Sequence, residues 1–180
     1  MKLAGLDFET ANDKNGSICA AGCAVLDNGV LTERKEWLVY PHIGYRWMCP
    51  DFTKIHGISY WDVCDCSEFD HIWPELQRML LSADCVVIHY APFDLRHLRS
   101  VLSLYELPPV EFDYTDSVDV SRKLFPEMPS HSLDAMAERF GIVFQHHDAL
   151  EDAMACASII ARTGIPEGYR QHFSTFPTEN

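Results

Sequence analysis

The amino-acid sequence predicts an α/β protein built on one mixed, five-stranded sheet flanked by helices. Two observations support this class: the first forty residues contain three consecutive strand-like segments, and the segments after residue 66 alternate between helix and strand. The chain has 180 residues, of which 47% are hydrophobic and 23% are charged. A chain of this length can bury about 70% of its unfolded surface around one core, so we expect a single domain.

The first three strands come from the front of the chain. Residues 2–9, 17–26 and 30–39 are apolar, or alternate between apolar and polar positions, as strands do. The turn at residues 27–29 contains Asn-Gly, a strong hairpin signal, and joins the second strand to the third. Residues 40–66 lack a sustained period and are interrupted by proline and glycine, which predicts an irregular excursion that reaches toward a substrate cleft.

The back of the chain alternates helices and strands. Apolar residues at helical spacing predict a helix that begins at Ser67 or Asp70 and ends near Leu81, followed by a buried strand at residues 84–90. Pro92 suits the first turn of the next helix, where its missing N–H costs nothing. The remaining predicted elements are a strand at 112–115 and helices at 118–124, 132–140 and 149–161. The helix stops are Gly141 and Gly164.

Composition narrows the class of protein further. No apolar run approaches the ~20 residues of a membrane span, and the N-terminus lacks the pattern of a secretory signal, so we expect a cytoplasmic protein that does not bind membranes. The seven cysteines form an odd set without an export signal, which predicts free thiols. Cys19, Cys23, Cys85 and Cys156 lie in apolar segments and are expected to be buried.

The net charge of −13 is unusual for a protein that binds a polyanion. Nucleic-acid binders usually neutralise phosphates with lysine and arginine. Acidic side chains that ligate cations would offset part of this charge, because bound cations reverse the local sign of a site. Several of the 27 acids are therefore expected to be metal ligands if the protein binds a polyanion, and long-range attraction of that polyanion would still be poor.

Two carboxylates stand close together near the end of the first predicted strand. Asp7 and Glu9, in the segment LDFET, are two residues apart and therefore share one face of the strand. Unpaired carboxylates at this separation repel each other, and a cation between them would relieve the repulsion. Two solvated acids at a strand end explain the pair equally well, so this motif alone does not establish a site.

A third acid follows the strand at residues 84–90. Asp94, in the segment HYAPFD, falls in the first turn of a helix, where an acid is also favoured by the helix dipole. The connection from a buried strand to a helix is, however, a common place for functional groups in α/β folds. The adjacent Phe93 could stack on a nucleobase or belong to the core.

The segment HHDALEDA supplies a histidine and a fourth acid. His147 and Asp152 are five residues apart, so on a helix their side chains would point about 140° away from each other. His147 is therefore expected just before the helix, where its imidazole could take a proton from a water molecule acidified by a metal. The alternatives are that the acids serve only as helix caps, and that His146 takes this role instead.

These three segments together resemble the three motifs of the DEDDh group of 3'-5' exonucleases, and in particular the exonucleases similar to the epsilon subunit of DNA polymerase III and to RNase T. LDFET, HYAPFD and HHDALEDA occur in the order and at the separations of that family, and the resemblance spans roughly residues 3–162. It implies a ribonuclease H-like, three-layer fold with the exonuclease domain at residues 1–164 and a loosely held C-terminal tail at residues 165–180.

The resemblance also implies the roles of individual residues. Asp7, Glu9, Asp94 and Asp152 match the family's metal-binding acids, and His147 matches its general base, which leaves His146, Asp148 and Glu151 as bystanders. Thr10, Ala11, Ile55, His56 and Phe93 match positions that border the terminal nucleotide. Tyr90 departs from the family pattern, which commonly has asparagine there, and is expected to fill space beside the metal site or to touch the substrate.

The activity implied by the resemblance is hydrolysis of the last phosphodiester at a 3' end, with two Mg²⁺ or Mn²⁺ ions bound by the four acids. Single-stranded or frayed DNA ends are the expected substrate, and short RNA is the alternative. A non-catalytic module that binds nucleic acid or a polymerase, and a phosphohydrolase of small molecules, are the other hypotheses. A stable replicative polymerase partner is not expected, because little sequence follows the domain.

Overall fold

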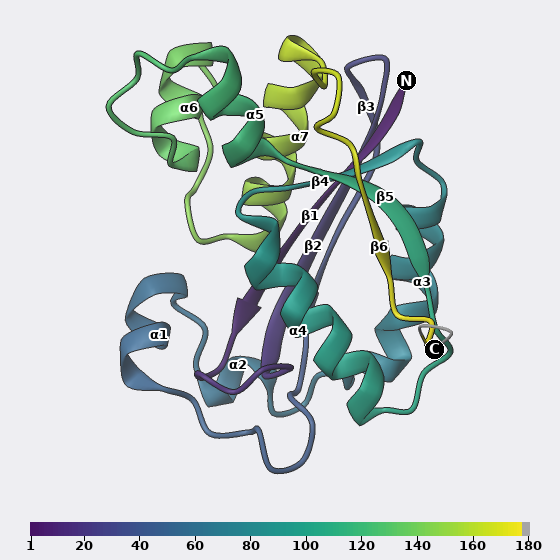
Figure 1. Ribbon diagram of the computed structural model, residues 1–180. Helices are drawn as coiled ribbons and strands as arrows, with labels where there is room; N and C mark the ends of the chain where they lie inside the picture. Colours follow the sequence, from purple (N-terminus) through teal and green to yellow (C-terminus); the bar gives the residue numbers. More distant parts are fainter. Residues whose placement is uncertain (178–180) are drawn as a thin grey trace.

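The computed structural model describes residues 1–177 and contains a six-stranded mixed sheet between two layers of helices (Figure 1). The sheet order is β3-β2-β1-β4-β5-β6, in which β1 pairs antiparallel with β2 and parallel with β4. The strands are β1 (Lys2–Thr10), β2 (Ile18–Asp27), β3 (Val30–Leu38), β4 (Cys85–Ile88), β5 (Glu111–Asp116) and β6 (Gln171–Ser174). The predicted class, a mixed sheet flanked by helices, is confirmed.

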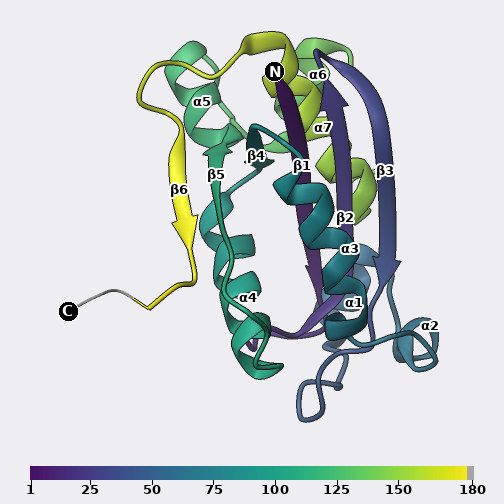
Figure 2. The same ribbon diagram turned by 90° about the vertical axis from the view of Figure 1, so that its right-hand side faces the viewer.

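The sixth strand differs from the predicted five and lies in the segment expected to be a loose tail. Gln171–Ser174 pair antiparallel with β5, and the ring of Phe173 packs on the ring of Phe112 with centroids 5.1 Å apart. Figure 2 shows β6, in yellow, beside β5 at the edge of the sheet. A strand of four residues with one buried apolar side chain has too few positions to produce a recognisable alternation. Pairing with β5 therefore decides that residues 171–174 form a strand.

The helices cover both faces of the sheet. One face packs on α3 (Phe69–Leu81) and α4 (Ala91–Leu104), through side chains such as Leu6 and Phe8 of β1. The other face packs on α5 (Ser117–Leu124), α6 (Leu133–Phe140) and α7 (Ala149–Thr163). In Figure 2, α3 lies in front of β1 and β2, and α7 lies behind them. The four cysteines expected in the core are all buried.

The segment at residues 40–66 is more regular than predicted, because it contains the short helices α1 (Pro50–His56) and α2 (Tyr60–Val63). It is attached to the chain that follows β1. The fully buried side-chain amide of Asn12 donates to the carbonyl oxygens of Tyr45 and Trp47, at 2.9 and 2.8 Å, and the N–H of Cys49 donates to the carbonyl of Ala11 at 2.7 Å. These bonds fix α1 beside the C-terminal end of β1.

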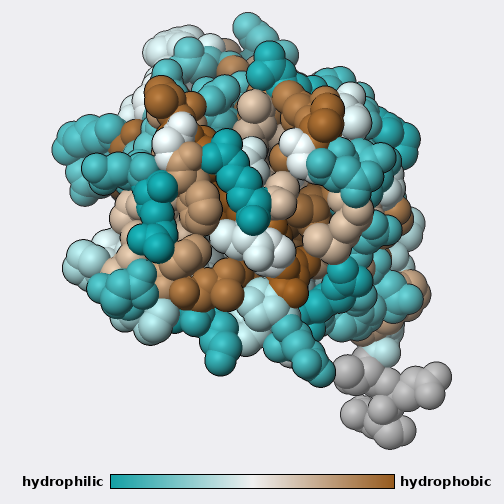
Figure 3. Space-filling view, turned by 90° about the horizontal axis from the view of Figure 1, so that it is seen from above, coloured by the Kyte–Doolittle hydropathy of each residue, from teal (hydrophilic) through white to brown (hydrophobic). Residues whose placement is uncertain are grey.

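The outer surface is mixed in character. In the view of Figure 3, hydrophobic side chains form small patches that are separated by hydrophilic ones. Within residues 1–177, none of the helices has the length and apolar character needed to cross a membrane.

Helix α7 lies directly against the backbone of the sheet at two glycines. A Cβ on Gly5 would overlap the carbonyl of Ala153, and a Cβ on Gly22 would overlap the carbonyl of Ala149. Space for even one methyl group is therefore missing between α7 and the strands β1 and β2. The closeness of this contact decides where the side chains of α7 lie relative to those of β1.

We expect Gly22→Ala to destabilise the protein by about 1–3 kcal/mol, because the added methyl group has to push α7 off the sheet. Thermal unfolding followed by circular dichroism measures the effect. Gly141→Ala is the matched control, since nothing lies within 4 Å of a Cβ there and only the strain of its positive φ, about 1 kcal/mol, is added. A Gly22→Ala protein as stable as the wild type would show that α7 can move at little cost.

Candidate active site

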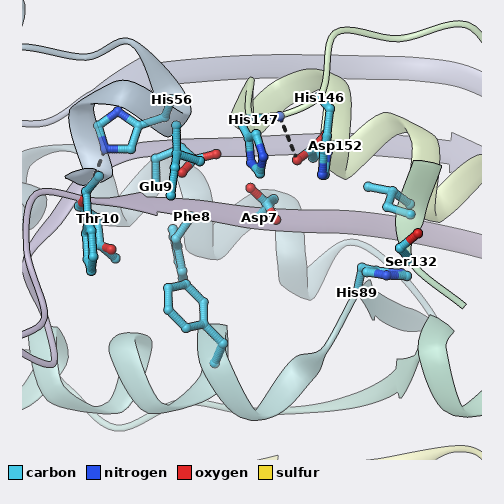
Figure 4. Close-up of a pocket in the computed structure, with 14 residues that line it drawn as sticks. Asp7, Phe8, Glu9, Thr10, His56, His89, Ser132, His146, His147 and Asp152 are labelled. Atoms are coloured by element: carbon cyan, nitrogen blue, oxygen red, sulfur yellow. Dashed lines mark hydrogen bonds and ion pairs between the residues drawn. The ribbon is translucent and has the colours of Figure 1, made fainter. Parts of the chain in front are cut away.

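Three carboxylates converge where β1 meets α7. Asp7 and Glu9 lie on the face of β1 that also carries Gly5, so the close approach of α7 brings Asp152 to them. One carboxylate oxygen from each of the three acids lies within 4.8 Å of the others. Figure 4 shows them at the middle of a pocket. The strand face predicted from the spacing of Asp7 and Glu9 is the one that faces the site.

Asp94 approaches the same place from the other side of β1. It lies in the first turn of α4, is 2% exposed, and accepts a hydrogen bond of 3.0 Å from the backbone N–H of Phe8 through Oδ1. The carboxylate does not line the pocket, unlike the other three acids. Its negative charge nevertheless contributes to raising the pKa of Asp7. The structure therefore places Asp94 behind the site, bonded to the main chain of the strand that carries Asp7 and Glu9.

The clustered acids hold their protons strongly. Burial, followed by the charges of Asp94 and Asp152, raises the pKa of Asp7 well above its usual value. Burial and the neighbouring carboxylates raise the pKa of Glu9 to about 8, and burial raises the pKa of Asp152. An uncompensated cluster of this kind is destabilised at neutral pH, and divalent cations relieve it. The all-oxygen donor set fits Mg²⁺ or Mn²⁺ better than zinc.

Two consecutive histidines lie beside Asp152. His147 precedes α7, as predicted, and its backbone N–H donates to Asp152 Oδ2 at 3.2 Å. His146 was expected to be a bystander, but its Nδ1 lies 3.1 Å from Asp152 Oδ1, and its ring stacks on the ring of His147 with centroids 3.9 Å apart. Burial and the proximity of His146 lower the pKa of His147, so this imidazole is neutral near pH 7. A neutral imidazole can accept a proton.

The acids expected to be bystanders in the same segment have a structural role. Asp148 is the N-cap of α7, and its carboxylate accepts a hydrogen bond of 3.0 Å from the backbone N–H of Glu151. Capping of this kind satisfies one of the free N–H groups at the start of a helix. The capping alternative therefore applies to Asp148, whereas Asp152 faces the pocket.

The pocket around the acids has a volume of about 380 Å³. Four of the six residues predicted to contact the substrate line it, namely Thr10, Ile55, His56 and Phe93. Six further lining residues were not predicted to contact the substrate: Phe8, Phe52, His89, Ser132, Leu133 and His146. The pocket thus joins α1, the end of β1, the start of α4, and the segments that lead into α6 and α7.

Ala11 and Tyr90 are not in the pocket. Ala11 is fully buried and belongs to a small cluster with Cys19 and Val63, so it packs the wall from behind. Tyr90 is 61% exposed and lies outside the pocket lining, so it does not fill space beside the acids. Its backbone is in the left-handed region, with φ 65° and ψ 56°. Asparagine tolerates this conformation better than tyrosine, for which it costs about 1–2 kcal/mol.

His56 fastens α1 to β1. Its Nδ1 accepts a hydrogen bond of 3.0 Å from the backbone N–H of Ile58, so Nε2 carries the proton and donates to the carbonyl oxygen of Thr10 at 3.1 Å. Burial lowers the pKa of this imidazole, which favours the neutral form that both bonds require. Both ring nitrogens are therefore used by main-chain groups, and His56 acts chiefly by positioning the pocket wall.

His89 marks the opposite end of the pocket. It directly follows β4, and its Nδ1 hydrogen-bonds Ser117 Oγ at 2.8 Å. Burial lowers the pKa of His89 to about 4, so the ring is neutral. Its position was detectable in the sequence, because polar residues at the carboxyl end of a parallel strand commonly face the site of an α/β fold. The contributions of Phe52 and Ser132 had no comparable signal, since they depend on how α1 and α6 fold back onto β1.

The fold and the acid cluster define the class of the protein, which is the exonucleases. Residues 5–160 match the family model RNase T, described as "Exonuclease", and the chain belongs to this family. It is 34% identical over 171 residues to the DNA polymerase III subunit epsilon of Rickettsia prowazekii, covering 88% of this chain and 72% of that protein.

The chain is also similar to part of a longer polymerase and to solved structures of exonucleases. The chain is 29% identical over 159 residues to the PolC-type DNA polymerase III of Caldanaerobacter subterraneus, covering 87% of this chain but spanning only 11% of that protein's length. Among solved structures, exonuclease X in complex with 5' overhanging duplex DNA is similar with a TM-score of 0.72 and 23% identity, covering 89% of this chain and 90% of that one. A 3'-exonuclease that recognises the 3' end of a histone mRNA stem-loop has a TM-score of 0.74 and 16% identity, covering 99% and 93%.

Proposed function

We propose that this protein is a metal-dependent 3'-5' exonuclease that removes nucleoside 5'-monophosphates from single-stranded or frayed DNA ends. The observation that carries the proposal is the convergence of Asp7, Glu9 and Asp152 within 4.8 Å, beside the neutral imidazole of His147. Repelling carboxylates are costly to assemble, and cation binding is the function that accounts for the cost.

In this proposal Asp7, Glu9 and Asp152, which line the pocket, hold two Mg²⁺ or Mn²⁺ ions, and Asp94 behind them completes the set of four acids that the family resemblance implies. The bound cations would supply positive charge for the scissile phosphate and would acidify the attacking water. The hydrogen bond from the Phe8 N–H keeps Asp94 facing the strand that carries Asp7 and Glu9. The N–H of His147 and the imidazole of His146 orient the Asp152 carboxylate in the same way.

His147 is assigned the role of general base. Its lowered pKa keeps the imidazole unprotonated at neutral pH, and the residue lies ahead of α7, next to Asp152 in the lining of the pocket. The imidazole accepts the proton of the attacking water, and attack at phosphorus breaks the bond to the 3' oxygen of the preceding nucleotide. The terminal nucleotide leaves as a 5'-monophosphate.

The substrate is expected to be DNA rather than RNA because the relative with 34% identity is a DNA polymerase III subunit epsilon. The pocket of about 380 Å³ is large enough for one nucleotide and is walled by apolar groups of Phe52, Ile55 and Phe93, which suit a base of any sequence. The histone-mRNA exonuclease shares the fold, so short RNA is the second candidate.

We expect the purified protein to shorten a labelled single-stranded DNA oligomer from its 3' end with Mg²⁺ or Mn²⁺, and to release only 5'-monophosphates. EDTA should reduce the rate to background, and added metal should restore it, because the acids need cations to act. Matched DNA and RNA oligomers, single- and double-stranded, decide the substrate class.

Three results would contradict the proposal in different ways. Binding of oligomers without hydrolysis in either metal would indicate a non-catalytic module. Turnover of mononucleotides without turnover of oligomers would indicate a small-molecule phosphohydrolase. Full activity in EDTA would show that the acid cluster is not a metal site.

A further inference from the structure

Tyr90 occupies a strained turn that does not require a tyrosine, and its side chain is exposed. Its φ of 65° is imposed by the carboxylate of Asp116, which accepts hydrogen bonds from the N–H groups of Tyr90 and Ala91, at 3.1 and 2.9 Å, and of Val118, at 2.9 Å. Asparagine or glycine would suit this turn with less strain. The tyrosine ring is 61% exposed, and no other aromatic ring within residues 1–177 packs on it. The side chain therefore contributes little to the fold.

The position of Tyr90 next to a residue that lines the pocket suggests a function for its ring. In Figure 4, Thr10 and His56 lie at one end of the pocket, the acids lie in the middle, and His89 and Ser132 lie at the other end. A phosphodiester held at the acids has one nucleotide on each side. The end beside Thr10 and His56 is lined by Phe52 and Ile55 of α1, whose apolar side chains suit the base of the terminal nucleotide, so the rest of the strand would leave past His89.

Tyr90 directly follows His89, and the Cα atoms of consecutive residues are about 3.8 Å apart. Phe93, three residues further on, lines the pocket again. The backbone of Tyr90 therefore lies next to a lining residue at the His89 end of the pocket, and its ring is exposed there. An exposed aromatic ring at the rim of a nucleic-acid pocket offers a stacking surface that does not depend on sequence.

We propose that Tyr90 stacks on the base of the penultimate nucleotide, on the 5' side of the scissile phosphate. This inference rests on the proposed exonuclease function and adds a contact that an asparagine at the same position could not make. Stacking of this kind would hold an unpaired strand in the pocket, and it would favour single-stranded or frayed ends over fully paired ones. Loss of one base–aromatic contact typically weakens binding about 5- to 100-fold.

The test compares Tyr90→Ala, Tyr90→Asn and Tyr90→Phe on single-stranded DNA oligomers. Tyr90→Ala and Tyr90→Asn should raise KM about 5- to 100-fold with kcat nearly unchanged, and Tyr90→Phe should retain wild-type values. Tyr90→Asn should at the same time raise Tm by a few degrees, because the strained turn is relieved. A purely structural role for tyrosine would move Tm and activity in the same direction.

An oligomer with an abasic penultimate nucleotide identifies the contact. The KM of the wild type should rise on this oligomer by as much as the Tyr90→Ala substitution raises KM on the intact one. The KM of Tyr90→Ala should rise no further on the abasic oligomer, since the same contact is already absent. An oligomer that is abasic at the fifth nucleotide is the position control and should behave as intact. Equal KM for wild type and Tyr90→Ala, or an undiminished abasic effect in Tyr90→Ala, would overturn the inference alone. Absence of hydrolysis by the wild type would overturn the proposed function and this inference with it.

Discussion

Asp7→Asn is expected to lower kcat/KM by about 10³-fold or more and, in the absence of metal, to make the protein more stable than the wild type. The loss of activity follows because Asp7 lies between Glu9 and Asp152, and the neutral amide of asparagine cannot replace its carboxylate as a ligand of a divalent cation. The gain in stability follows because burial and four neighbouring acids raise the pKa of Asp7, so its charged form is disfavoured in the folded state. We expect this gain at pH 8, where Asp7 of the unfolded chain is ionised.

Thermal unfolding in EDTA and in Mn²⁺ measures both parts of this prediction. Metal should raise the Tm of wild type and have little effect on Asp7→Asn. Folded Glu9 has a pKa of about 8, against 4.5 ordinarily, so the folded state binds more protons and metal-free stability falls as pH rises from about 4.5 to about 8. The gain from Asp7→Asn should therefore be smaller at pH 5 than at pH 8.

The matched control for Asp7→Asn is Asp13→Asn, since Asp13 is exposed and lies outside the pocket. It should leave activity and metal-free Tm unchanged. A metal-free Asp7→Asn protein that is less stable than wild type would show that the carboxylates are paired in some other way and do not repel one another.

His147→Ala is expected to lower kcat by about 10²–10⁴-fold while the Tm increase on metal binding is retained. The side chain of His147 accepts a proton in the proposed reaction, whereas only its backbone N–H bonds to Asp152, and alanine keeps that N–H. Rapid-quench measurement of the first turnover separates this chemical step from product release. The metal-induced shift in Tm is measured on the same preparation.

His146→Ala provides the comparison, because the two histidines are adjacent and their rings stack. His146 bonds to the Asp152 carboxylate through its side chain, so its loss should weaken metal binding and lower kcat by less than about 10-fold at saturating metal. A larger loss of kcat for His146→Ala than for His147→Ala would exchange the two roles. It would also show that the general base is the histidine whose side chain bonds to Asp152.

Much of the fold could be predicted because long segments of regular period decide it. The strands at the front and the helices ending at Leu81, Gly141 and Gly164 are where apolar spacing and stop residues place them. Strand β6 could not be predicted, because four residues carry too little pattern and Phe173 is buried only by its partner strand. The same limit explains why residues 40–66 were expected to be irregular.

The candidate site, like the fold, could be predicted only in part. No single pair of acids was persuasive, and the expectation that Asp7, Glu9 and Asp152 share one site came from the resemblance of the motifs, taken together, to a known family. Their carboxylate oxygens lie within 4.8 Å of one another. The bonds that hold the pocket together were not foreseen, because they run from side chains to main-chain groups far away in the sequence. Asn12 to the carbonyl of Tyr45 and His56 to the carbonyl of Thr10 are of this kind. Sequence patterns record which side chains are apolar and contain no direct information on such partners.

The absence of space between α7 and the sheet at Gly5 and Gly22 has a consequence for how the protein would bind the proposed metal ions. Main chain packs on main chain there, so the separation between the acids of β1 and Asp152 of α7 is determined by backbone contact and not by flexible side chains. The carboxylates are thus preorganised: they would stay together if bound cations dissociated, and rebinding would require no reordering of the chain. The energy needed to hold like charges together comes from folding, and each binding event recovers part of it as affinity.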